Sequence, residues 1–284
     1  MPPLLMAGVR FFAAGLVLCA WALARGERLP GLAQWGAVSV MAVLIFVIDY
    51  GLLFWAEQRV PSGMSAVILA TIPAFMALSE IALLGTQRLT YRLAASLAVG
   101  LGGVLVLVDP WIKVGGAPIY TLGAIGLTVA ALSWSVAASL ARLLPLPSSK
   151  LMSSGAQMLL GGALLGVLAA ALGELRELDL RSITSGGWAS LVYLTVAGSI
   201  IGFTAYTWLI QHVAPTKVGT YAYVNPLVAV LIGYYLGGEG LDGRTLIGTL
   251  CVIASVIIIT TGKSRASRAP LAGDARAAPS DGTA

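Results

Sequence analysis

The fold is decided by two stretches of sequence that resemble each other. Residues 35–61 read WGAVSVMAVLIFVIDYGLLFWAEQRVP, and residues 188–215 read WASLVYLTVAGSIIGFTAYTWLIQHVAP. Each stretch has a tryptophan at both ends of an apolar run and then passes through a glutamine to a proline. An apolar run of about 20 residues is long enough for an α-helix to cross the hydrocarbon core of a bilayer. The two stretches therefore predict a pair of related membrane-spanning helices.

The rest of the chain has the same character. Its 284 residues are 58% hydrophobic and only 10% charged, whereas roughly a quarter of the residues in a soluble domain are charged. The sequence predicts an all-α integral membrane protein, a helical bundle with nine spanning helices at residues 4–24, 36–56, 63–84, 91–108, 119–141, 151–173, 188–211, 215–237 and 244–262.

An internal repeat links the two halves of the chain. Four landmark pairs share one offset of 153 residues: Trp35 with Trp188, Trp55 with Trp208, Pro73 with Pro226, and Gly85 with Gly238. The second half holds five expected helices, and an odd number of crossings forces the two halves into opposite orientations. The sequence therefore predicts inverted repeats, an architecture of many secondary transporters.

The first half contains one helix fewer than the second. The helix that would match residues 119–141 falls before residue 1, so we expect a tenth helix upstream of this sequence. The expected domains are a first repeat at 1–110 without its first helix and a second repeat at 119–262. A polar tail at 263–284 is too poor in apolar residues to form a core and is expected to be disordered and cytoplasmic.

The basic residues predict an orientation. The net charge is +5, but the positive residues are spread along the connectors without a patch, which argues against nucleic acid as a partner. With the C-terminus in the cytoplasm, the cytoplasmic side holds 11 basic residues and the other side holds 6, with Arg10 counted among the 6. Cytoplasmic connectors are normally the more basic ones.

Three stretches resemble the EamA family of the drug/metabolite transporter superfamily. They are Pro2-Pro3-Leu4-Leu5-Met6-Ala7-Gly8-Val9-Arg10-Phe11; Trp55-Ala56-Glu57-Gln58 with Val60-Pro61-Ser62-Gly63 and Pro73; and Tyr221-Ala222-Tyr223-Val224-Asn225-Pro226 with Gly238-Glu239. The resemblance extends over about residues 2–262. It implies ten helices, cytoplasmic termini, a location in the bacterial inner membrane and a substrate path between the halves.

Two positions depart from the family pattern. Gly85-Thr86 replaces the Gly-Glu that the second half keeps as Gly238-Glu239, and Asp49 stands where many relatives have asparagine. A carboxylate deep in a spanning helix costs several kcal/mol unless it is hydrated, paired or protonated. Two interpretations of Asp49 remain open: a proton carrier or contact for a cationic substrate, and a protonated or hydrogen-bonded structural residue.

Paired prolines suggest where the substrate path lies. Pro226 removes a backbone hydrogen bond in the middle of 215–237, and Pro73 interrupts the matching helix of the first half. Tyr221 and Asn225 share one helix face at a spacing of four residues. We expect these four residues to line the path, with simple packing kinks as the alternative.

Trp134, between Ser133 and Ser135, is a further candidate for the path. It could stack on an aromatic or cationic ligand, and core packing is the competing interpretation. Glu80 is expected to extend toward the cytoplasmic surface, and the only histidine, His212, is expected to be solvated in a connector. Neither these residues nor the two cysteines suggest a metal site.

The function predicted from the sequence is secondary transport, with export of small metabolites or drugs by alternating access. The chain contains no phosphate-binding loop, so direct use of ATP is disfavoured, and one histidine is too few for the usual catalytic groupings. We expect no enzyme activity and no cofactor. The expected partners are lipid and a small-molecule substrate, with the chain acting as a monomer or weak homodimer. The alternative function is a structural or sensory membrane subunit.

Overall fold

The computed structural model describes residues 1–60, 65, 68–108, 121–180, 183–225, 228 and 243–261. These residues contain helices and no strand. The described elements of the first half are α1 (Pro3–Ala24), α2 (Leu32–Ala42), η1 (Val43–Tyr50), α3 (Gly51–Glu57), α5 (Ile72–Ser79), η2 (Glu80–Leu84) and α6 (Tyr91–Val108). Those of the second half are α8 (Thr121–Leu140), α9 (Lys150–Ala171), α10 (Ser185–Tyr193), η4 (Leu194–Phe203), α11 (Thr204–His212), α12 (Pro215–Val218) and α14 (Gly243–Thr261).

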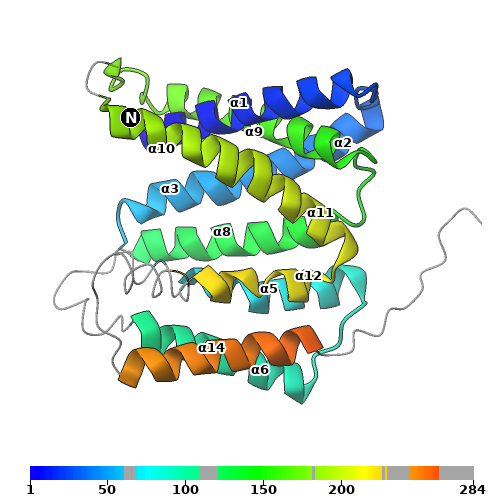
Figure 1. The fold of residues 1–284 in the computed structure, drawn as a ribbon, viewed down its shortest axis with the longest axis vertical. Coiled ribbons are helices and arrows are strands. Elements are labelled where there is room, and N and C mark those ends of the chain that lie inside the picture. Colours follow the sequence, from blue (N-terminus) through cyan, green and yellow to red (C-terminus); the bar gives the residue numbers. More distant parts are fainter. Residues whose placement is uncertain are drawn as a thin grey trace, which may run out of the picture.

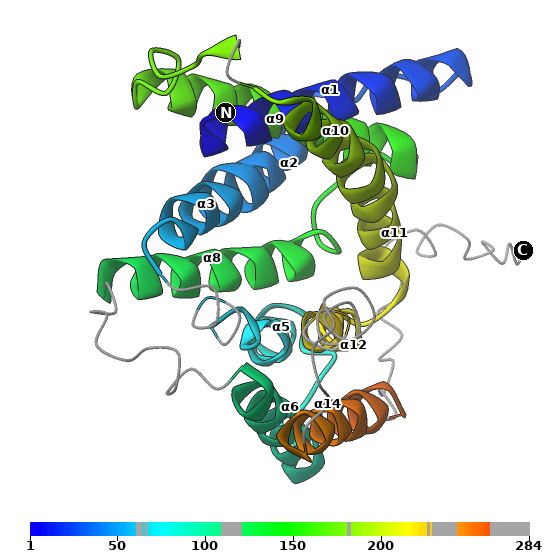
Figure 2. The same ribbon diagram turned by 60° about the vertical axis from the view of Figure 1, so that its left-hand side comes forward.

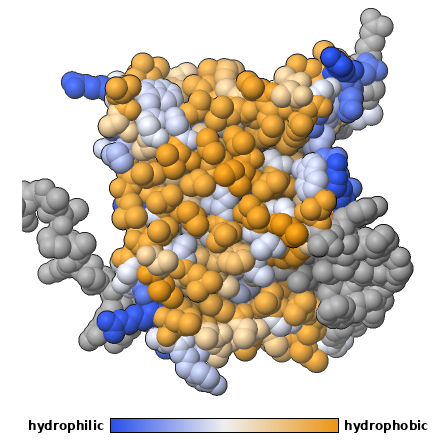
Figure 3. Space-filling view, turned by 180° about the vertical axis from the view of Figure 1, so that it is seen from behind, coloured by the Kyte–Doolittle hydropathy of each residue, from blue (hydrophilic) through white to orange (hydrophobic). Residues whose placement is uncertain are grey.

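Several helices are long and apolar enough to cross a membrane. Five qualify by length and composition: Pro3–Ala24, Leu32–Glu57, Leu122–Leu140, Lys150–Ala171 and Ser185–His212. The surface seen from behind is broadly apolar, and its hydrophilic residues gather mainly near the helix ends (Figure 3). Apolar side chains exposed over the helix middles, with polar groups at the ends, are what a bilayer requires. The protein is therefore an all-α, multi-pass membrane protein.

The helices are stacked in layers. In Figures 1 and 2, α1 and α9 form one outer layer, and α6 and α14 form the opposite one. Between them lie the span from α2 through η1 to α3, then α8, and then α5 beside α12. The helices α10 and α11, joined by η4, form one continuous span that crosses beside these inner layers.

Helices at equivalent positions in the two halves run in opposite directions. The span that begins with α2 at Leu32 corresponds to the one that begins with α10 at Ser185, which is 153 residues later. In Figure 1 the first runs from right to left and the second from left to right. The same reversal relates α1 to α9 and α6 to α14.

Within each outer layer, the two helices pack against each other through glycines. A Cβ added at Gly162 of α9 would lie 2.8 Å from the carbonyl oxygen of Gly8 in α1, and one added at Gly15 would lie 2.8 Å from the carbonyl oxygen of Gly155. In the other outer layer, a Cβ at Gly103 would lie 2.9 Å from the carbonyl oxygen of Gly248. Glycine therefore allows the two backbones of each pair to approach closely. We call these contacts the α1/α9 seam and the α6/α14 seam.

The described helices lie where the sequence predicts spanning segments. The expected spans 4–24 and 91–108 correspond to α1 and α6, and the expected span 119–141 corresponds to α8. In the expected span 215–237, the described part includes α12 and continues to residue 225. Pro226, Gly238-Glu239 and the tail at 263–284 lie outside the described residues.

Candidate substrate site

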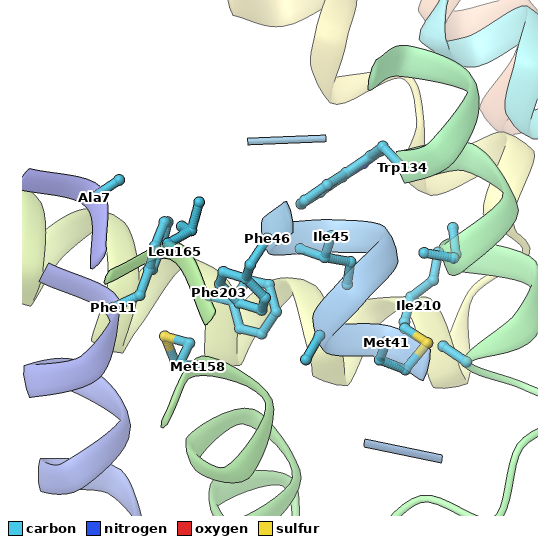
Figure 4. Packing of buried hydrophobic residues seen from close by; sticks show 14 of the residues in the cluster. Ala7, Phe11, Met41, Ile45, Phe46, Trp134, Met158, Leu165, Phe203 and Ile210 are labelled. Carbon is cyan, nitrogen blue, oxygen red and sulfur yellow. The ribbon is translucent and has the colours of Figure 1, made fainter. Parts of the chain in front are cut away.

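A cluster of aromatic rings fills the interior between the two halves. Ring centroids 4.6 to 6.3 Å apart connect its members in one continuous network. Figure 4 shows Phe46 and Phe203 side by side, with Phe11 near them and Trp134 reaching in from α8. We call this set the aromatic cluster: Phe11, Phe46, Tyr50, Phe54, Trp134, Phe203, Tyr206 and Tyr221.

Two π-helical segments supply the centre of the aromatic cluster. Phe46 and Tyr50 belong to η1, and Phe203 ends η4. π-Helical turns are uncommon and often occur at functional sites. A serine from a neighbouring helix contacts the irregular backbone, because Ser133 Oγ donates a hydrogen bond of 2.8 Å to the carbonyl of Leu44 in η1. Both π-helical segments therefore contribute rings to the space between the halves.

Asp49 lies at the edge of the aromatic cluster. It is 6% exposed, and within the described residues its carboxylate has no hydrogen-bond or ion-pair partner. It interacts electrostatically with Tyr50, Tyr206 and Tyr221, which come from both halves of the chain. A carboxylate at such a depth costs roughly 2.5–3.5 kcal/mol. The carboxyl group therefore has three phenol rings as neighbours, and no residue in the described part of the chain pairs with it.

Trp134 is in the middle of the aromatic cluster. Its ring centroid is 4.6 Å from that of Tyr206 and 6.2 Å from that of Tyr50. The side chain is 8% exposed, and its buried Nε1 makes no hydrogen bond of normal geometry with a described residue, although Tyr221 lies close enough to interact with it. Trp134 thus has a core environment, with Tyr221 as the neighbour of its Nε1.

Of the other predicted path residues, the structure places only Tyr221 in the aromatic cluster. Tyr221 packs edge-on against Tyr206, with ring centroids 6.3 Å apart, and so joins Asp49 and Trp134. Asn225, one turn further, is exposed. Pro73 is buried in the first turn of α5, where a Cβ added at Gly219 would lie 3.3 Å from the Cα of Pro73. Pro226 lies outside the described residues.

Glu80 corrects one expectation. The sequence predicted that its side chain extends to the surface, and this is wrong, because Glu80 is fully buried. Its carboxylate accepts hydrogen bonds from the Thr216 backbone N–H at 3.0 Å and hydroxyl at 2.7 Å, and from the Thr86 hydroxyl at 2.9 Å. Local sequence could not reveal this role, since Thr216 comes from the other half of the chain.

Arg10 corrects a second expectation. Although it falls in the expected span 4–24, the charge count included it among the basic residues of one side, but inside α1 it is only 9% exposed. Its guanidinium packs over the Phe11 ring, 4.6 Å from the centroid, and Nε donates a hydrogen bond of 2.8 Å to Ser199 Oγ in η4. A second buried charge therefore lies beside the aromatic cluster, on the α1 side.

The fold and this interior site define a helical membrane protein with an aromatic, charged centre between two halves. The chain belongs to the EamA-like transporter family, whose model matches residues 1–109 and 121–261. This confirms the resemblance to the drug/metabolite transporter superfamily. The protein is accordingly a transporter of that superfamily.

Its relatives include proteins named as transporters and exporters. The chain is 36% identical over 265 residues to the uncharacterized inner membrane transporter YedA of Escherichia coli strain K12. The matched stretch covers 92% of this chain and 83% of YedA. It is 26% identical over 259 residues to protein PecM of Dickeya dadantii strain 3937, covering 90% and 82% of the two chains. It is 27% identical over 249 residues to a probable terminal-alkyne amino-acid exporter of Streptantibioticus cattleyicolor, covering 87% and 79%.

A solved structure has the same fold. A chain described as "Crystal structure of protein" superimposes with a TM-score of 0.74 and 21% sequence identity, over 92% of this chain and 88% of that chain. At that identity the likeness concerns the fold alone.

Proposed function

We propose that the protein is a secondary transporter that exports small metabolites or drugs across the bacterial inner membrane. Transport would proceed by alternating access, with the two inverted halves opening a shared central site first to one side and then to the other. The relatives named as inner membrane transporters and as an exporter support this location and direction.

The repeat supports the mechanism. Elements at the 153-residue offset run in opposite directions, as inverted halves require. The family model also matches in two segments, residues 1–109 and 121–261, which agree with the proposed repeats at 1–110 and 119–262. Two related halves of opposite orientation can exchange conformations around one site, so that each takes the other's role.

The observation on which the proposal mainly rests is Asp49 beside the aromatic cluster. A buried carboxylate without a described cation partner is costly, and a structural residue would more often be paired. Aromatic rings bind cationic and apolar groups through their faces. We infer that Asp49 contacts a cationic group of the substrate or carries a proton, and that Trp134, Tyr221 and Pro73 line the path. Asn225 and Pro226 would border it.

The orientation follows from the basic residues. Because Arg10 is buried in α1, it does not belong in the count of connector charges. Without it, the bias toward the side of the C-terminus is larger than the sequence count suggested. We propose a cytoplasmic C-terminus, with the start of α12 on the cytoplasmic side and the end of α3 on the other.

The same site argues for transport over the alternative functions. A structural or sensory subunit has no need of an unpaired carboxylate among rings from both halves, and such a site suggests a small-molecule ligand more than a reaction centre. Both halves of one chain contribute to the site, so we propose that the protein acts as a monomer or weak homodimer in lipid. We also propose that it needs no cofactor.

The test is transport by the purified protein in sealed vesicles. A broad screen of labelled solutes should find at least one that crosses only when the protein is present and leaves chemically unchanged. Asp49→Asn should slow transport of a cationic solute by about tenfold or more, since a charge-assisted contact contributes roughly 1.5–3 kcal/mol. It should also flatten the pH dependence if Asp49 carries a proton.

The matched control is Glu57→Gln, which removes an exposed carboxylate at the end of the same span. Transport by this variant should match that of the wild type. If Asp49→Asn moves the same solute at the same rate and with the same pH profile, the role given to Asp49 is wrong. If the broad screen finds no transported solute, the transport proposal fails as a whole.

A further inference from the structure

Glu80 joins the two halves of the chain at one end of the helices. Its fully buried carboxylate in η2 accepts two hydrogen bonds through one oxygen, from the Thr216 backbone N–H at 3.0 Å and from the Thr216 hydroxyl at 2.7 Å. The Thr86 hydroxyl donates to the other oxygen, at 2.9 Å. Thr216 belongs to α12, which lies beside α5 in Figures 1 and 2. We call Glu80, Thr86 and Thr216 the Glu80 cluster.

The end of α5 that carries Glu80 is itself held in place. Ser79 precedes Glu80, and its hydroxyl lies 2.9 Å from both the Ser135 carbonyl oxygen and Ser139 Oγ of α8. After η2 the chain turns at Gly85, whose φ of +64° is left-handed, and Thr86 then lies close enough to donate to Glu80. The carboxylate is therefore oriented from its own half, and α12 supplies the remaining donors from the other half.

A hydrogen-bonded carboxylate suits a contact that has to open and close. Burying a carboxylate is costly unless donors satisfy it, so the closed arrangement is stable only while α12 supplies Thr216. If α12 moves away, water that enters from the ends of the helices can hydrate the carboxylate and the threonine hydroxyls. Exchanging a hydrogen bond within the protein for one to water changes the free energy little. The Glu80 cluster can therefore hold the contact without making it permanent.

The internal repeat does not duplicate the Glu80 cluster. At the offset of 153 residues, Glu80 corresponds to Gly233 and Thr86 corresponds to Glu239. Glycine has no carboxylate, and glutamate replaces a hydroxyl donor by an acceptor. The departure from the family pattern at Thr86 fits the cluster as well, because a glutamate there would place a second carboxyl group beside Glu80. Two identical halves would give the conformations open to either side equal free energies, and a contact made by one half favours one of them.

We propose that the Glu80 cluster is a gate that keeps the cytoplasmic end closed, so that the protein without substrate rests in the conformation open to the opposite side. Opening to the cytoplasm requires α12 to leave Glu80. Thr86 is a positioning residue that orients the carboxylate. This inference rests on the proposed function, because a gate has a role only in alternating access, and on the proposed orientation, in which α12 begins at the cytoplasmic side.

The test measures how readily α12 separates from its neighbours. Val218 of α12 is 8% exposed and serves as the reporter in the variant Val218→Cys, made in a chain whose native Cys19 and Cys251 are changed to alanine. Inside-out membrane vesicles are treated with a membrane-impermeant maleimide, which reaches the protein from the cytoplasmic side. The rate of labelling then reports how often the cytoplasmic end opens.

Two substitutions should raise that rate. Thr216→Val removes the hydroxyl and keeps the shape of the side chain, and Glu80→Gln replaces one accepting oxygen by an amide group that donates. Each should speed the labelling of Val218→Cys about threefold to tenfold, the scale of one lost hydrogen bond. All rates are measured well below the melting temperature of the variant, so that the folded protein is what reacts.

The matched control is Thr220→Val. Thr220 is 7% exposed in the same segment, but its hydroxyl donates to the Lys217 carbonyl at 2.7 Å and so bonds within the second half. Its loss should leave the labelling rate unchanged. A second reporter, Ala169→Cys, replaces a fully buried residue near the end of α9 and detects general loosening. Its labelling should be the same with and without the Glu80 cluster.

The outcomes separate this inference from the transport proposal, because labelling requires no solute. Unchanged labelling of Val218→Cys in both Thr216→Val and Glu80→Gln overturns the gate and leaves the transporter standing. Equal acceleration of Val218→Cys and Ala169→Cys also overturns it, since the Glu80 cluster would then only stabilise the fold. If the labelling changes as expected but the broad screen finds no transported solute, the transport proposal fails and the Glu80 cluster remains as a contact that controls opening.

Discussion

At the scale of single residues, the interior is marked by buried polar groups for which the described residues provide few partners. Asp49, Arg10 and the Nε1 of Trp134 are all buried beside one set of aromatic rings. In a protein built only for stability, such groups would pair with one another or be replaced by apolar side chains. We propose that their arrangement between the halves serves to bind a polar ligand.

Trp134 offers a direct test of ligand contact. Trp134→Ala removes a ring that lies 4.6 Å from Tyr206, and it should raise the apparent KM for a cationic aromatic solute about threefold to thirtyfold, because a cation–π contact contributes roughly 0.5–2 kcal/mol. Trp134→Phe should lie between the wild type and the alanine variant. Initial rates of uptake into vesicles give the KM values.

The control for Trp134 is a tryptophan on the outside. Trp188→Ala changes a residue of α10 that is 44% exposed, and its KM should equal that of the wild type. Equal KM values for Trp134→Ala and Trp188→Ala would identify Trp134 as a core residue without a role in binding, which is the other interpretation of this position.

The sequence predicted some of these residues and missed others for a clear reason. Asp49 could be predicted because it lies near the middle of an apolar run, where a charge is unexpected. Arg10 falls in the expected span 4–24 but was used only in the charge count, and its partner could not be predicted because only the packing of η4 against α1 brings Ser199 to it. Depth along one helix is a local property, whereas a partner on another helix is not.

At the scale of helical elements, two of the five apolar spans are not regular α-helices. The span Leu32–Glu57 changes to π-helix in η1, and the span Ser185–His212 does so in η4. Hydropathy predicted that both spans exist, and the 153-residue offset predicted that they are related. Neither signal indicated the π-helical turns, since hydropathy and repeat spacing do not distinguish a π-helical turn from an α-helical one; in η1 the Leu44 carbonyl accepts a hydrogen bond from Ser133 of α8.

Glu80 links η2 of the first half to the start of α12 in the second. Glu80→Ala would leave the Thr216 N–H buried without its acceptor, at a cost of roughly 1–3 kcal/mol. We expect a lower melting temperature for the purified protein in detergent. Glu57→Ala, which removes an exposed carboxylate from α3, should have the same melting temperature as the wild type. Coincident melting of all three proteins would contradict the structural role of Glu80.

The α1/α9 seam gives a second test at this scale. Gly162→Ala places a Cβ 2.8 Å from the Gly8 carbonyl, and backbone atoms cannot move aside cheaply, so the variant should lose roughly 1–3 kcal/mol. Gly166 lies one turn further on α9, and a Cβ added there meets nothing within 4 Å. Gly166→Ala should therefore be as stable as the wild type or slightly more stable. Thermal unfolding would separate the two, and equal losses would mean that the seam is looser than described.

At the scale of the whole molecule, opposite orientation of the halves is the feature on which alternating access depends. It predicts that residues related by the offset of 153 face opposite sides of the membrane. Arg59 follows α3 and His212 ends α11, and both are exposed. They are separated by that offset.

This prediction can be checked by labelling from one side. Arg59→Cys and His212→Cys are placed singly in a chain whose native Cys19 and Cys251 are changed to alanine, and intact cells are treated with a membrane-impermeant thiol reagent. Arg59→Cys should react from outside, and His212→Cys only after the cells are opened. If both react from the same side, the halves are not inverted and the transport mechanism proposed here is wrong.

The two glycine seams also bear on how the protein is made. Each seam joins a helix of the first half to one synthesised much later, α1 to α9 and α6 to α14. During translation α1 and α6 must therefore remain in the bilayer without their final neighbours, and the last pairing waits until α14 has left the ribosome. Assembly should thus be completed only at the end of synthesis, which makes shortened chains lacking α14 natural targets for membrane proteases.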